Sequence, residues 1–429
     1  MVQDEKYRKI GRVDVMMKGN AIYAQSGGVT SVINASAYGV IKASMKADFI
    51  ENIYGGYYGI NGILEENLID FQMESEEVIE GLRYTPSGAL GSCRKKLPDI
   101  ETNRSDFERI LKVFEAHNIR YFFYNGGNDS MDTCYKISMI AEELGYDLIA
   151  VGIPKTVDND LPETDNCPGF GSVAKYNAIS ILEGGFDVES MHRDSTKVFV
   201  LETMGRHAGW IAASTGLAHR TAKDGPHIIL LPEITFNKER FLSKLDETIK
   251  KIGYAVVAVS EGIKDNGGKF VADSGLKDAF GHVQLGGAGQ AVSDIIKREL
   301  KLKVHTAIMD YCQRSGRHIA SQTDVEQAVA CGEKAVEFAG QGLNGKMVII
   351  VRENNDPYQW SIGCTDIIKI ANKEKKLPKE YISQDGFHIT DDFRIYCEPL
   401  IIGEDYPPYL NGLPSYTRLE KHLIQKKLE

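Results

Sequence analysis

A short apolar run that ends in charged residues is the feature that most constrains the fold of this chain. Residues 148–153 read LIAVGI and are followed directly by PKTVDND at residues 154–160. Because the run is short, rich in β-branched residues and bounded by turn residues, it predicts a buried strand. Parallel α/β sheets bind ligands outside the carboxyl ends of their strands, where this run delivers a lysine, a hydroxyl and carboxylates. A turn that only caps a strand has the same composition. The other strand ends therefore decide between a ligand-binding site and a simple turn.

Two other predicted strands end in glycine-rich turns. Residues 20–25 precede SGGVTS and helical spacing over residues 32–41, and residues 118–124 precede NGGNDS and a predicted helix over residues 131–144. The backbone N–H groups of a glycine turn at the start of a helix readily bind a phosphate. A tight βα turn would look alike, and the chain has neither a GxGxxG nor a GxxxxGK[ST] motif. Three successive strands with such ends nevertheless favour a shared binding site.

The second half of the chain repeats the alternation of strands and helices. Its predicted strands are residues 197–201, 228–233, 255–262 and 306–314, and its predicted helices are residues 175–184, 211–218 and 290–302. The strand at 197–201 runs into ETMGRHAGW, which brings Arg206 and His207 to a strand end. A glycine-rich loop at residues 85–96 ends in three cations, which suit either an anionic ligand or a solvated surface. Alternating units of this kind predict an α/β fold.

Length and composition indicate two lobes in an ordinary globular protein. The chain has 429 residues, 42% of them hydrophobic and 26% charged, and no apolar stretch reaches the length of about 20 residues that spans a bilayer. Residues 1–18 form a polar leader without the apolar centre of a signal peptide, so we expect a cytoplasmic protein that does not bind membranes. The formal charge of -10 argues against a nucleic-acid partner. The seven cysteines lack CxxC spacing, which predicts reduced thiols and no zinc site.

Four motifs taken together resemble the signature series of the phosphofructokinase family. They are Gly27-Gly28, GGNDS at residues 126–130, PKTVDND at residues 154–160 and MGRH at residues 204–207. Their order and spacing match the family over about residues 20–360. The resemblance implies two Rossmann-like lobes of strand–helix units, with the active site in the cleft between them.

The resemblance also implies how the chain divides. We expect a donor-binding lobe at residues 19–165, joined by part of residues 313–365, and a sugar-phosphate-binding lobe at residues 166–312. Residues 366–429 are expected to form a helical, polar extension.

Two positions concern the phosphoryl donor. ATP-using members of the family have glycine where Asp129 and Lys155 stand, and this pair is typical of the pyrophosphate-using members. An aspartate beside the donor would crowd and repel the α-phosphate of a nucleotide, by about 1–4 kcal/mol for unit charges ~4 Å apart. Lys155 offers a compact cation to a small, highly charged donor. The implied glycolytic reaction is reversible phosphoryl transfer from pyrophosphate to the 1-hydroxyl of fructose 6-phosphate, giving fructose 1,6-bisphosphate and phosphate.

The resemblance implies residue roles position by position. Asp158 would take the proton of the attacking 1-hydroxyl, as an ionised carboxylate can at neutral pH. Thr156 and Arg206 would offset charge on the transferred phosphoryl group, and Lys155 completes the catalytic set. The implied donor contacts are Gly27, Gly28, Arg94, Gly127, Asp129 and Lys155. The implied sugar-phosphate contacts are Thr156, Val157, Asp158, Met204, Gly205, Arg206, Glu261, Tyr311, Arg314 and Lys197.

Three positions depart from the family pattern. Asn128 stands where the family usually has a magnesium-ligating aspartate, and its neutral oxygen would hold the ion less strongly. Mg²⁺ is still the implied cofactor, with Asn128 and Asp129 as candidate ligands. Lys197 and, by ungapped counting, His305 stand where arginines of a neighbouring subunit reach the sugar phosphate, and both lack the bidentate fork. The resemblance therefore implies a homodimer or homotetramer.

Other functions stay open from the sequence alone. An ATP-dependent phosphofructokinase would share the fold and the sugar substrate. A non-catalytic regulatory subunit of the same fold need not retain Lys155, Asp158 and Arg206 together, which speaks against that alternative. A Rossmann oxidoreductase is disfavoured because the GxGxxG motif is missing.

Overall fold

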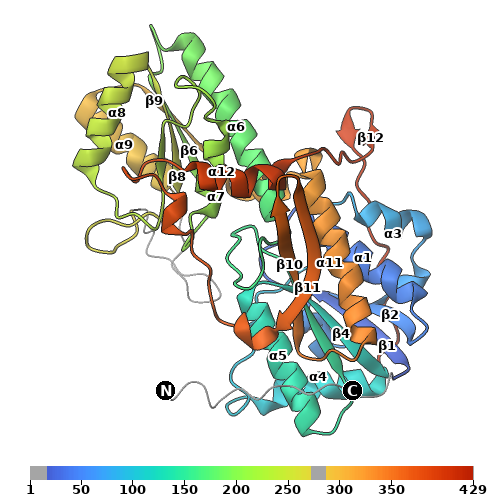
Figure 1. Cartoon of the computed structure of the whole chain (residues 1–429). Helices are drawn as coiled ribbons and strands as arrows, with labels where there is room; N and C mark the ends of the chain where they lie inside the picture. Colours follow the sequence, from blue (N-terminus) through green and yellow to red (C-terminus); the bar gives the residue numbers. More distant parts are fainter. Residues whose placement is uncertain (1–16, 272–286, 429) are drawn as a thin grey trace.

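The computed structural model describes residues 17–271 and 287–428. The polar leader expected at residues 1–18 lies, apart from its last two residues, outside the described part. Two lobes are stacked along the long axis of the molecule, each built around its own sheet (Figure 1). This confirms the expected α/β architecture.

The lower lobe contains a seven-stranded sheet in the order β11-β10-β5-β4-β1-β2-β3. Its strands are β1 (Gly19–Gln25), β2 (Ile50–Gly56), β3 (Leu68–Asp70), β4 (Ile119–Gly126), β5 (Ile149–Pro154), β10 (Lys346–Asn355) and β11 (Tyr358–Asp366). β1, β4 and β5 are neighbouring parallel strands, and their last residues are in register, with Gln25 opposite Asn125 and Gly126 opposite Pro154. The three polar strand ends predicted from the sequence therefore meet at one edge of the sheet.

Helices cover both faces of this sheet because β4 alternates its apolar side chains. Tyr121 and Phe123 face a core shared with α1 (Ile33–Lys46) and α11 (Gln322–Gly340). The intervening residues, Phe122 and Tyr124, face α4 (Arg104–Ala116) and α5 (Asn128–Glu143). All four rings are fully buried.

Helices α1 and α11 pack closely through glycines. A Cβ atom on Gly39 would lie 2.3 Å from the carbonyl oxygen of Val329, and one on Gly332 would lie 2.2 Å from that of Ser36. Only glycine allows the two backbones to approach this closely. The small residues thus fix α11, and the hairpin that follows it, against the lower lobe.

The upper lobe has a four-stranded parallel sheet in the order β7-β8-β6-β9. Its strands are β6 (Val198–Thr203), β7 (Ile228–Leu230), β8 (Ala255–Ser260) and β9 (Val304–Ile308). α6 (Phe170–Met191) and α7 (Trp210–Ser214), which η3 (Thr215–Ala218) extends, cover one face, and α8 (Lys238–Ile252) and α9 (Ala288–Leu300) cover the other. Strands buried on both faces explain the continuous apolar runs in the sequence.

The remaining short elements connect these layers. They are α2 (Ile60–Leu64), η2 (Phe71–Met73), α3 (Glu76–Leu82), α10 (Asp310–Ser315), η4 (Arg317–Ile319), η5 (Ile367–Lys369), η6 (Lys379–Tyr381), α12 (Asp391–Cys397), η7 (Glu398–Ile401), β12 (Tyr409–Leu410) and β13 (Leu413–Pro414).

One predicted strand is wrong in its second half. The sequence suggested a strand over residues 306–314, but β9 stops at Ile308 and residues 310–315 form α10. The reason is Gln313, which is buried and accepts hydrogen bonds from Asn177 Nδ2 (3.0 Å) and the Met204 backbone (3.3 Å). A helical turn points this amide into the junction of the lobes.

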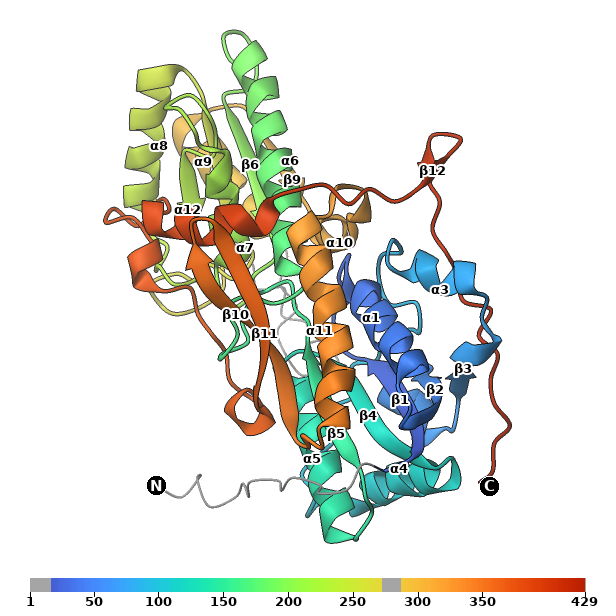
Figure 2. The ribbon, with the colours of Figure 1, turned by 45° about the vertical axis from the view of Figure 1, so that its right-hand side comes forward.

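The extension expected to be helical over residues 366–429 contains helical segments only as far as Ile401, among them α12. After Ile401 the described chain contains no helix; the β12–β13 hairpin projects from the body, and the last residues run down the edge of the lower lobe (Figure 2). There the Asp70 N–H donates to His422 O (2.8 Å) and the Ile424 N–H donates to Leu68 O (2.9 Å). The buried carboxylate of Glu66 accepts from the backbone of Leu428 (3.1 Å). The tail backbone thus pairs with the sheet edge instead of with itself.

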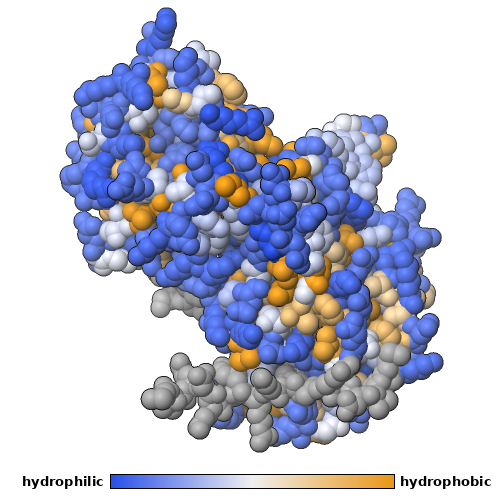
Figure 3. Space-filling model, viewed as in Figure 1, coloured by the Kyte–Doolittle hydropathy of each residue, from blue (hydrophilic) through white to orange (hydrophobic). Residues whose placement is uncertain are grey.

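The surface is mainly hydrophilic on the face shown in Figure 3, with apolar side chains gathered over part of the lower lobe. Among the described residues, no helix combines the length and the apolar character needed to cross a membrane.

Candidate active site

A cleft of about 1050 Å³ lies between the lobes, at the carboxyl ends of the strands. The lower lobe contributes the segments after β1, β4 and β5, and the upper lobe contributes those after β6, β8 and β9. The structure brings together most of the site residues predicted from the sequence, and those that line the cleft are Gly27, Gly28, Arg94, Gly127, Asn128, Asp129, Lys155, Thr156, Val157, Asp158, Met204, Arg206, Glu261, Tyr311 and Arg314.

The Gly27-Gly28 turn after β1 lets cations approach the backbone. Gly27 has a φ of +76°, and its N–H donates to Cys93 O at 3.0 Å, which ties the turn to the basic loop. A Cβ atom on Gly27 would lie 3.3 Å from Lys155 Nζ, and one on Gly28 would lie 3.1 Å from Arg314 Nη1. Larger residues would occupy the space between the turn and these two cations.

Three cations from different segments gather at this turn. Burial, reinforced by the charge of Arg314, lowers the pKa of Lys155 to about 8. Burial also lowers the pKa of Arg314, and the charge of Arg94 acts in the same direction. A bound anion would favour the charged forms of both groups, so this end of the cleft suits a phosphate or pyrophosphate.

The loop after β5 has a fixed shape. Thr156 Oγ1 accepts from the Asp158 N–H at 3.1 Å. Asn159 adopts a left-handed φ of 53°, donates from Nδ2 to Tyr396 Oη (2.8 Å) and accepts from the Cys167 N–H (3.0 Å). Because Asn159 is fully buried and hydrogen-bonded, it holds the loop while its neighbour Asp158 lines the cleft.

Asp158 is surrounded by other acidic groups. Burial, followed by the charges of Asp160 and Glu261, raises its pKa to about 7, against the opposing effect of Lys155 and Arg206. Burial and the charge of Glu374 raise the pKa of Asp160 as well. A carboxyl group that titrates near neutrality is suited to act as a general base.

The upper-lobe loop after β6 depends on Gly205. This residue has a φ of +131°, its N–H donates to Glu261 Oε1 at 3.3 Å, and its carbonyl oxygen accepts from Ser260 Oγ at 2.6 Å. Gly205 itself does not line the cleft; it orients the loop so that Met204 and Arg206 do. His207, next in sequence, contacts Glu374 at 2.9 Å.

The start of α5 carries the two candidate metal ligands. Asp129 Oδ1 accepts from Lys96 Nζ at 2.7 Å. Asn128 Oδ1 accepts from the Asp129 N–H at 2.8 Å, and its Nδ2 donates to Lys373 O at 3.2 Å. The described part of the chain contains no group of three or more His, Cys, Asp or Glu side chains placed to hold a metal ion. These residues therefore fit a metal ion only if the substrate supplies much of its coordination shell.

Lys197 and His305 lie away from this cleft. Lys197 precedes β6, whereas the cleft is at the opposite end of that strand, and six residues at about 3.3 Å each separate the two positions by about 20 Å. His305 pairs with Phe199 near the same end of the sheet and is exposed. Neither side chain reaches the cleft of its own chain.

The structure also adds cleft residues that were not among the site residues predicted from the sequence. They include Lys96, Asp160, Glu202, His207, Asp310, Gln313, Asn372 and Glu374. Asp160 lies within the PKTVDND stretch and His207 within MGRH, so those motifs contained the signal. Asn372 and Glu374 come from the segment expected to form a polar extension, and no local signal distinguishes them.

Comparisons with known proteins agree with this geometry. The family model described as phosphofructokinase matches residues 20–339. A pyrophosphate–fructose 6-phosphate 1-phosphotransferase of Methylococcus capsulatus is 56% identical and one of Halomonas elongata is 55% identical, each over 96% of this chain and 99% of the relative. The crystal structure of a pyrophosphate-dependent phosphofructokinase from Nitrosospira multiformis, 55% identical, covers 96% of this chain and 99% of its own, with a TM-score of 0.89.

Proposed function

Because the chain belongs to the phosphofructokinase family, we propose that its cleft transfers a phosphoryl group reversibly from pyrophosphate to the 1-hydroxyl of fructose 6-phosphate. The products are fructose 1,6-bisphosphate and phosphate, and the step belongs to glycolysis. One observation supports the proposal most directly: Asp158 and the Gly27-Gly28 turn, with cations close to that turn, line the same cleft.

Asp158 acts as the general base in this proposal. It accepts the proton of the 1-hydroxyl while the hydroxyl oxygen forms a bond to the terminal phosphorus of pyrophosphate. The bond between that phosphorus and the bridging oxygen breaks, and inorganic phosphate leaves with the electron pair. In the reverse direction the protonated Asp158 returns the proton to the sugar oxygen.

Cations compensate the charge of the reacting groups. Arg206 from the upper lobe and the Thr156 hydroxyl hold the transferred phosphoryl group, where positioning and electrostatics supply most of the catalysis. Lys155, with Arg94, faces the second phosphate at the Gly27-Gly28 turn. Gly127 and Asp129 border the donor on the α5 side.

The sugar phosphate occupies the upper-lobe side of the cleft. Val157, Met204, Arg206 and Glu261 surround the sugar, and Gly205 shapes their loop. Tyr311 and Arg314 of α10 grip the 6-phosphate. Lys197 cannot do so within its own chain, so we infer that it completes the site of a second copy in a homodimer or homotetramer.

Phosphotransferases of this family use a divalent metal ion, and we infer that it is Mg²⁺. Asn128 and Asp129 would hold it together with pyrophosphate oxygens, because hard cations prefer oxygen ligands. When bound, the ion would neutralise charge on the phosphoryl groups. The protein itself would orient the donor between Lys155 and Asp158.

The lobes divide the work. We propose that residues 19–165, joined by part of residues 313–365, bind the donor and that residues 166–312 bind the sugar phosphate. In support, β10 and β11 belong to the lower sheet, and all strands of the upper sheet lie between residues 198 and 308.

The direct test is an assay of the purified protein with fructose 6-phosphate and either pyrophosphate or ATP as donor. We expect formation of fructose 1,6-bisphosphate with pyrophosphate and little or none with ATP. Activity with ATP alone would contradict the donor while leaving the fold and the sugar substrate in place. No turnover with either donor would contradict the proposed function.

A further inference from the structure

Residues 371–377, here called the strap, cross from one lobe to the other beside the cleft. Ile370, immediately before the strap, is fully buried in the lower core, and Leu377 at its end is buried in the upper core. In Figure 1 this orange-red segment rises from beside α5 to the upper lobe. Since both ends are anchored, the strap holds a defined path across the cleft.

The strap contacts the lower lobe next to the start of α5. Asn372 Nδ2 donates to Asp132 Oδ1 at 3.0 Å, and Asn372 Oδ1 accepts from Lys96 Nζ at 3.4 Å. The carbonyl oxygen of Lys373 accepts from Asn128 Nδ2 at 3.2 Å. Lys96 in turn pairs with Asp129, so the strap is connected to the residues that border the donor.

The strap then contacts the catalytic loop and the upper lobe. The Lys375 N–H donates to Asp160 O at 2.6 Å, and the Lys375 carbonyl oxygen accepts from Trp210 Nε1 at 3.1 Å. Glu374 contacts His207 at 2.9 Å.

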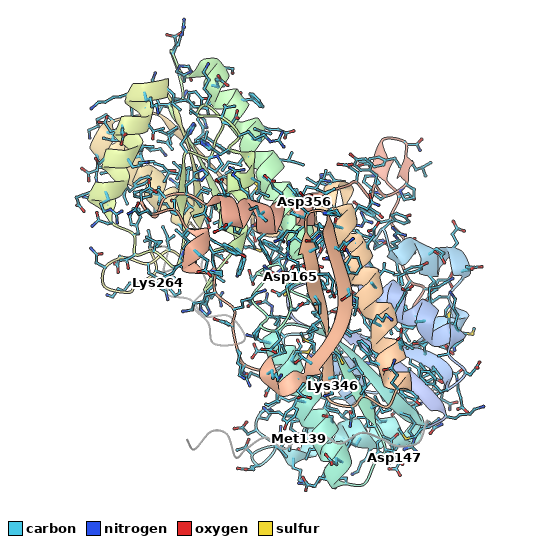
Figure 4. All side chains as sticks on the ribbon, viewed as in Figure 1. Met139, Asp147, Asp165, Lys264, Lys346 and Asp356 are labelled. Atoms are coloured by element: carbon cyan, nitrogen blue, oxygen red, sulfur yellow. The ribbon has the colours of Figure 1, made fainter. Side chains whose placement is uncertain are left out.

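A partly buried lysine fixes the middle of the strap. Lys375 Nζ donates to the carbonyl oxygens of Thr164 (3.0 Å) and Asp165 (2.9 Å). Asp165 lies beside the β10–β11 hairpin, where the lobes meet (Figure 4), and pairs there with Arg352 at 2.9 Å. The path of the strap is thus set independently of the two side chains that it turns toward the cleft.

Asn372 and Glu374 are the strap side chains that line the cleft, together with Lys96 and Asp129. In the proposed function pyrophosphate extends from Asp158 to the Gly27-Gly28 turn, so a longer polyphosphate would have to continue past that point. We propose that the strap is a second determinant of donor size, in which Asn372 and Glu374 close the outer side of the donor pocket to anything longer than pyrophosphate. This inference rests on the proposed function, because it assumes that the cleft binds pyrophosphate.

Two physical effects make the strap selective. Asn372 occupies the space beside the Lys96–Asp129 pair, and the Glu374 carboxylate adds negative charge near Asp160, which opposes a third phosphate. Pyrophosphate would be affected less, because in the proposed function its phosphates lie on the side of Lys155 and Arg94. The strap would act even on a donor that lacks a nucleoside.

The test compares pyrophosphate with inorganic tripolyphosphate, which extends the donor without adding a base or sugar. The variants are Asn372→Gly, Glu374→Gln, and Asn372→Gly combined with Glu374→Ala. Glycine at 372 keeps the native backbone, because Asn372 has a φ of 58°. Lys376→Ala is the matched control, since Lys376 belongs to the strap, is exposed and does not line the cleft.

The measured quantity is kcat/KM for tripolyphosphate divided by kcat/KM for pyrophosphate, at fixed fructose 6-phosphate. We expect the double variant to raise this ratio about tenfold or more and Lys376→Ala to leave it unchanged. The single variants should raise this ratio by smaller factors. If thermal unfolding shows that the double variant does not fold, the ratios of the single variants are compared with that of Lys376→Ala instead. Equal ratios in the cleft-lining variants and in Lys376→Ala would overturn the proposal.

Calorimetric binding of tripolyphosphate separates this proposal from the proposed function. We expect the double variant to bind tripolyphosphate about tenfold more tightly than the unmodified protein does. Unchanged affinity would contradict the strap's role. A protein that binds polyphosphates but never phosphorylates fructose 6-phosphate would contradict the proposed reaction instead.

Discussion

At the scale of single residues, the site depends on how the fold perturbs Asp158. Asp160 and Glu261 add negative charge around a partly buried carboxylate, while Lys155 and Arg206 offset it. The balance places the pKa of Asp158 at about 7 rather than near the ordinary aspartate value of about 3.9. The same acidic neighbours that make Asp158 a stronger base would repel an anionic donor if the cations at the Gly27-Gly28 turn were absent.

Replacing Asp158 tests the general base. Asp158→Asn should lower kcat about 10²- to 10⁴-fold, because the hydroxyl proton then has no acceptor, and should change the KM for fructose 6-phosphate little. Steady-state kinetics with pyrophosphate as donor measure both constants. Far-UV circular dichroism serves as the control that the variant is folded. Near-normal turnover would contradict the assignment of Asp158 as the general base.

The pH dependence should follow from the same group and from Lys155. Asp158 must be ionised to accept a proton, so kcat/KM should fall as the pH drops through about 7. Lys155 must be charged to hold pyrophosphate, so kcat/KM for pyrophosphate should fall again as the pH rises through about 8. The measurement is a profile of kcat/KM from pH 5 to 10, and a flat profile around neutrality would contradict this account.

Donor choice should respond to Asp129 and Lys155 separately. Asp129→Gly removes a carboxylate that pairs with Lys96 at 2.7 Å, which should make ATP-dependent activity detectable. Lys155→Gly removes a buried cation beside Gly27 and should mainly lower kcat/KM for pyrophosphate. Because both residues contact one donor, the double variant should differ from the product of the single effects. If Asp129→Gly and the unmodified protein were equally inactive with ATP, Asp129 would not be the obstacle.

At the scale of elements, the first turn of α5 connects metal, donor and strap. Asn128 begins this helix, and its side chain already bonds both the Asp129 N–H and the carbonyl oxygen of Lys373. An aspartate could still accept the first bond, but it could not donate the second. The neutral residue therefore joins the strap to the helix through a hydrogen bond that a carboxylate could not donate.

Asn128→Asp should strengthen metal binding at this position and remove the hydrogen bond to the carbonyl oxygen of Lys373. The added charge should lower the Mg²⁺ concentration that gives half-maximal activity by a small factor. The lost hydrogen bond should lower the free energy of unfolding by about 0.5–1.5 kcal/mol. Magnesium titrations and chemical denaturation measure the two effects. An unchanged magnesium dependence would exclude this position from metal binding.

At the scale of the whole molecule, the location of Lys197 determines what a complete site requires. The cleft and Lys197 are at opposite ends of β6, so a single chain cannot bring them together. A second copy could supply Lys197 from its own upper lobe. The active species would then be at least a dimer.

Mixing two inactive or weakened variants tests this arrangement. Lys197→Ala should raise the KM for fructose 6-phosphate and spare that for pyrophosphate. When it is mixed with Asp158→Asn, activity should recover in part, because a hybrid dimer has one site with both groups intact. Each variant alone is the control. Absence of recovery, with subunit exchange verified by mass spectrometry, would show that the site lies within one chain.

Local patterns explain why much of the fold was predictable. β1, β4 and β5 were predicted as apolar runs bounded by turns, and α1 was predicted by its helical spacing, because short-range propensity and burial pattern agree in these segments. The motifs that directly follow these three strands contribute many of the cleft residues, because the carboxyl ends of the strands meet at the cleft. The donor-determining pair, the candidate base and the sugar loop are all visible in contiguous sequence.

Tertiary structure alone decided the rest. Nothing local shows that residues 346–366 return to the lower sheet beside β5, that residues 422–424 pair with its edge, or that Asn372 and Glu374 line the cleft. These features depend on contacts between residues more than a hundred positions apart, which no local period encodes. The amino-acid sequence by itself determined the strand–helix alternation and the chemistry at the strand ends. The packing of distant segments determined the pKa of Asp158, the separation of Lys197 from the cleft and the position of the strap beside the cleft, because charge, burial and distance exist only once the lobes are assembled.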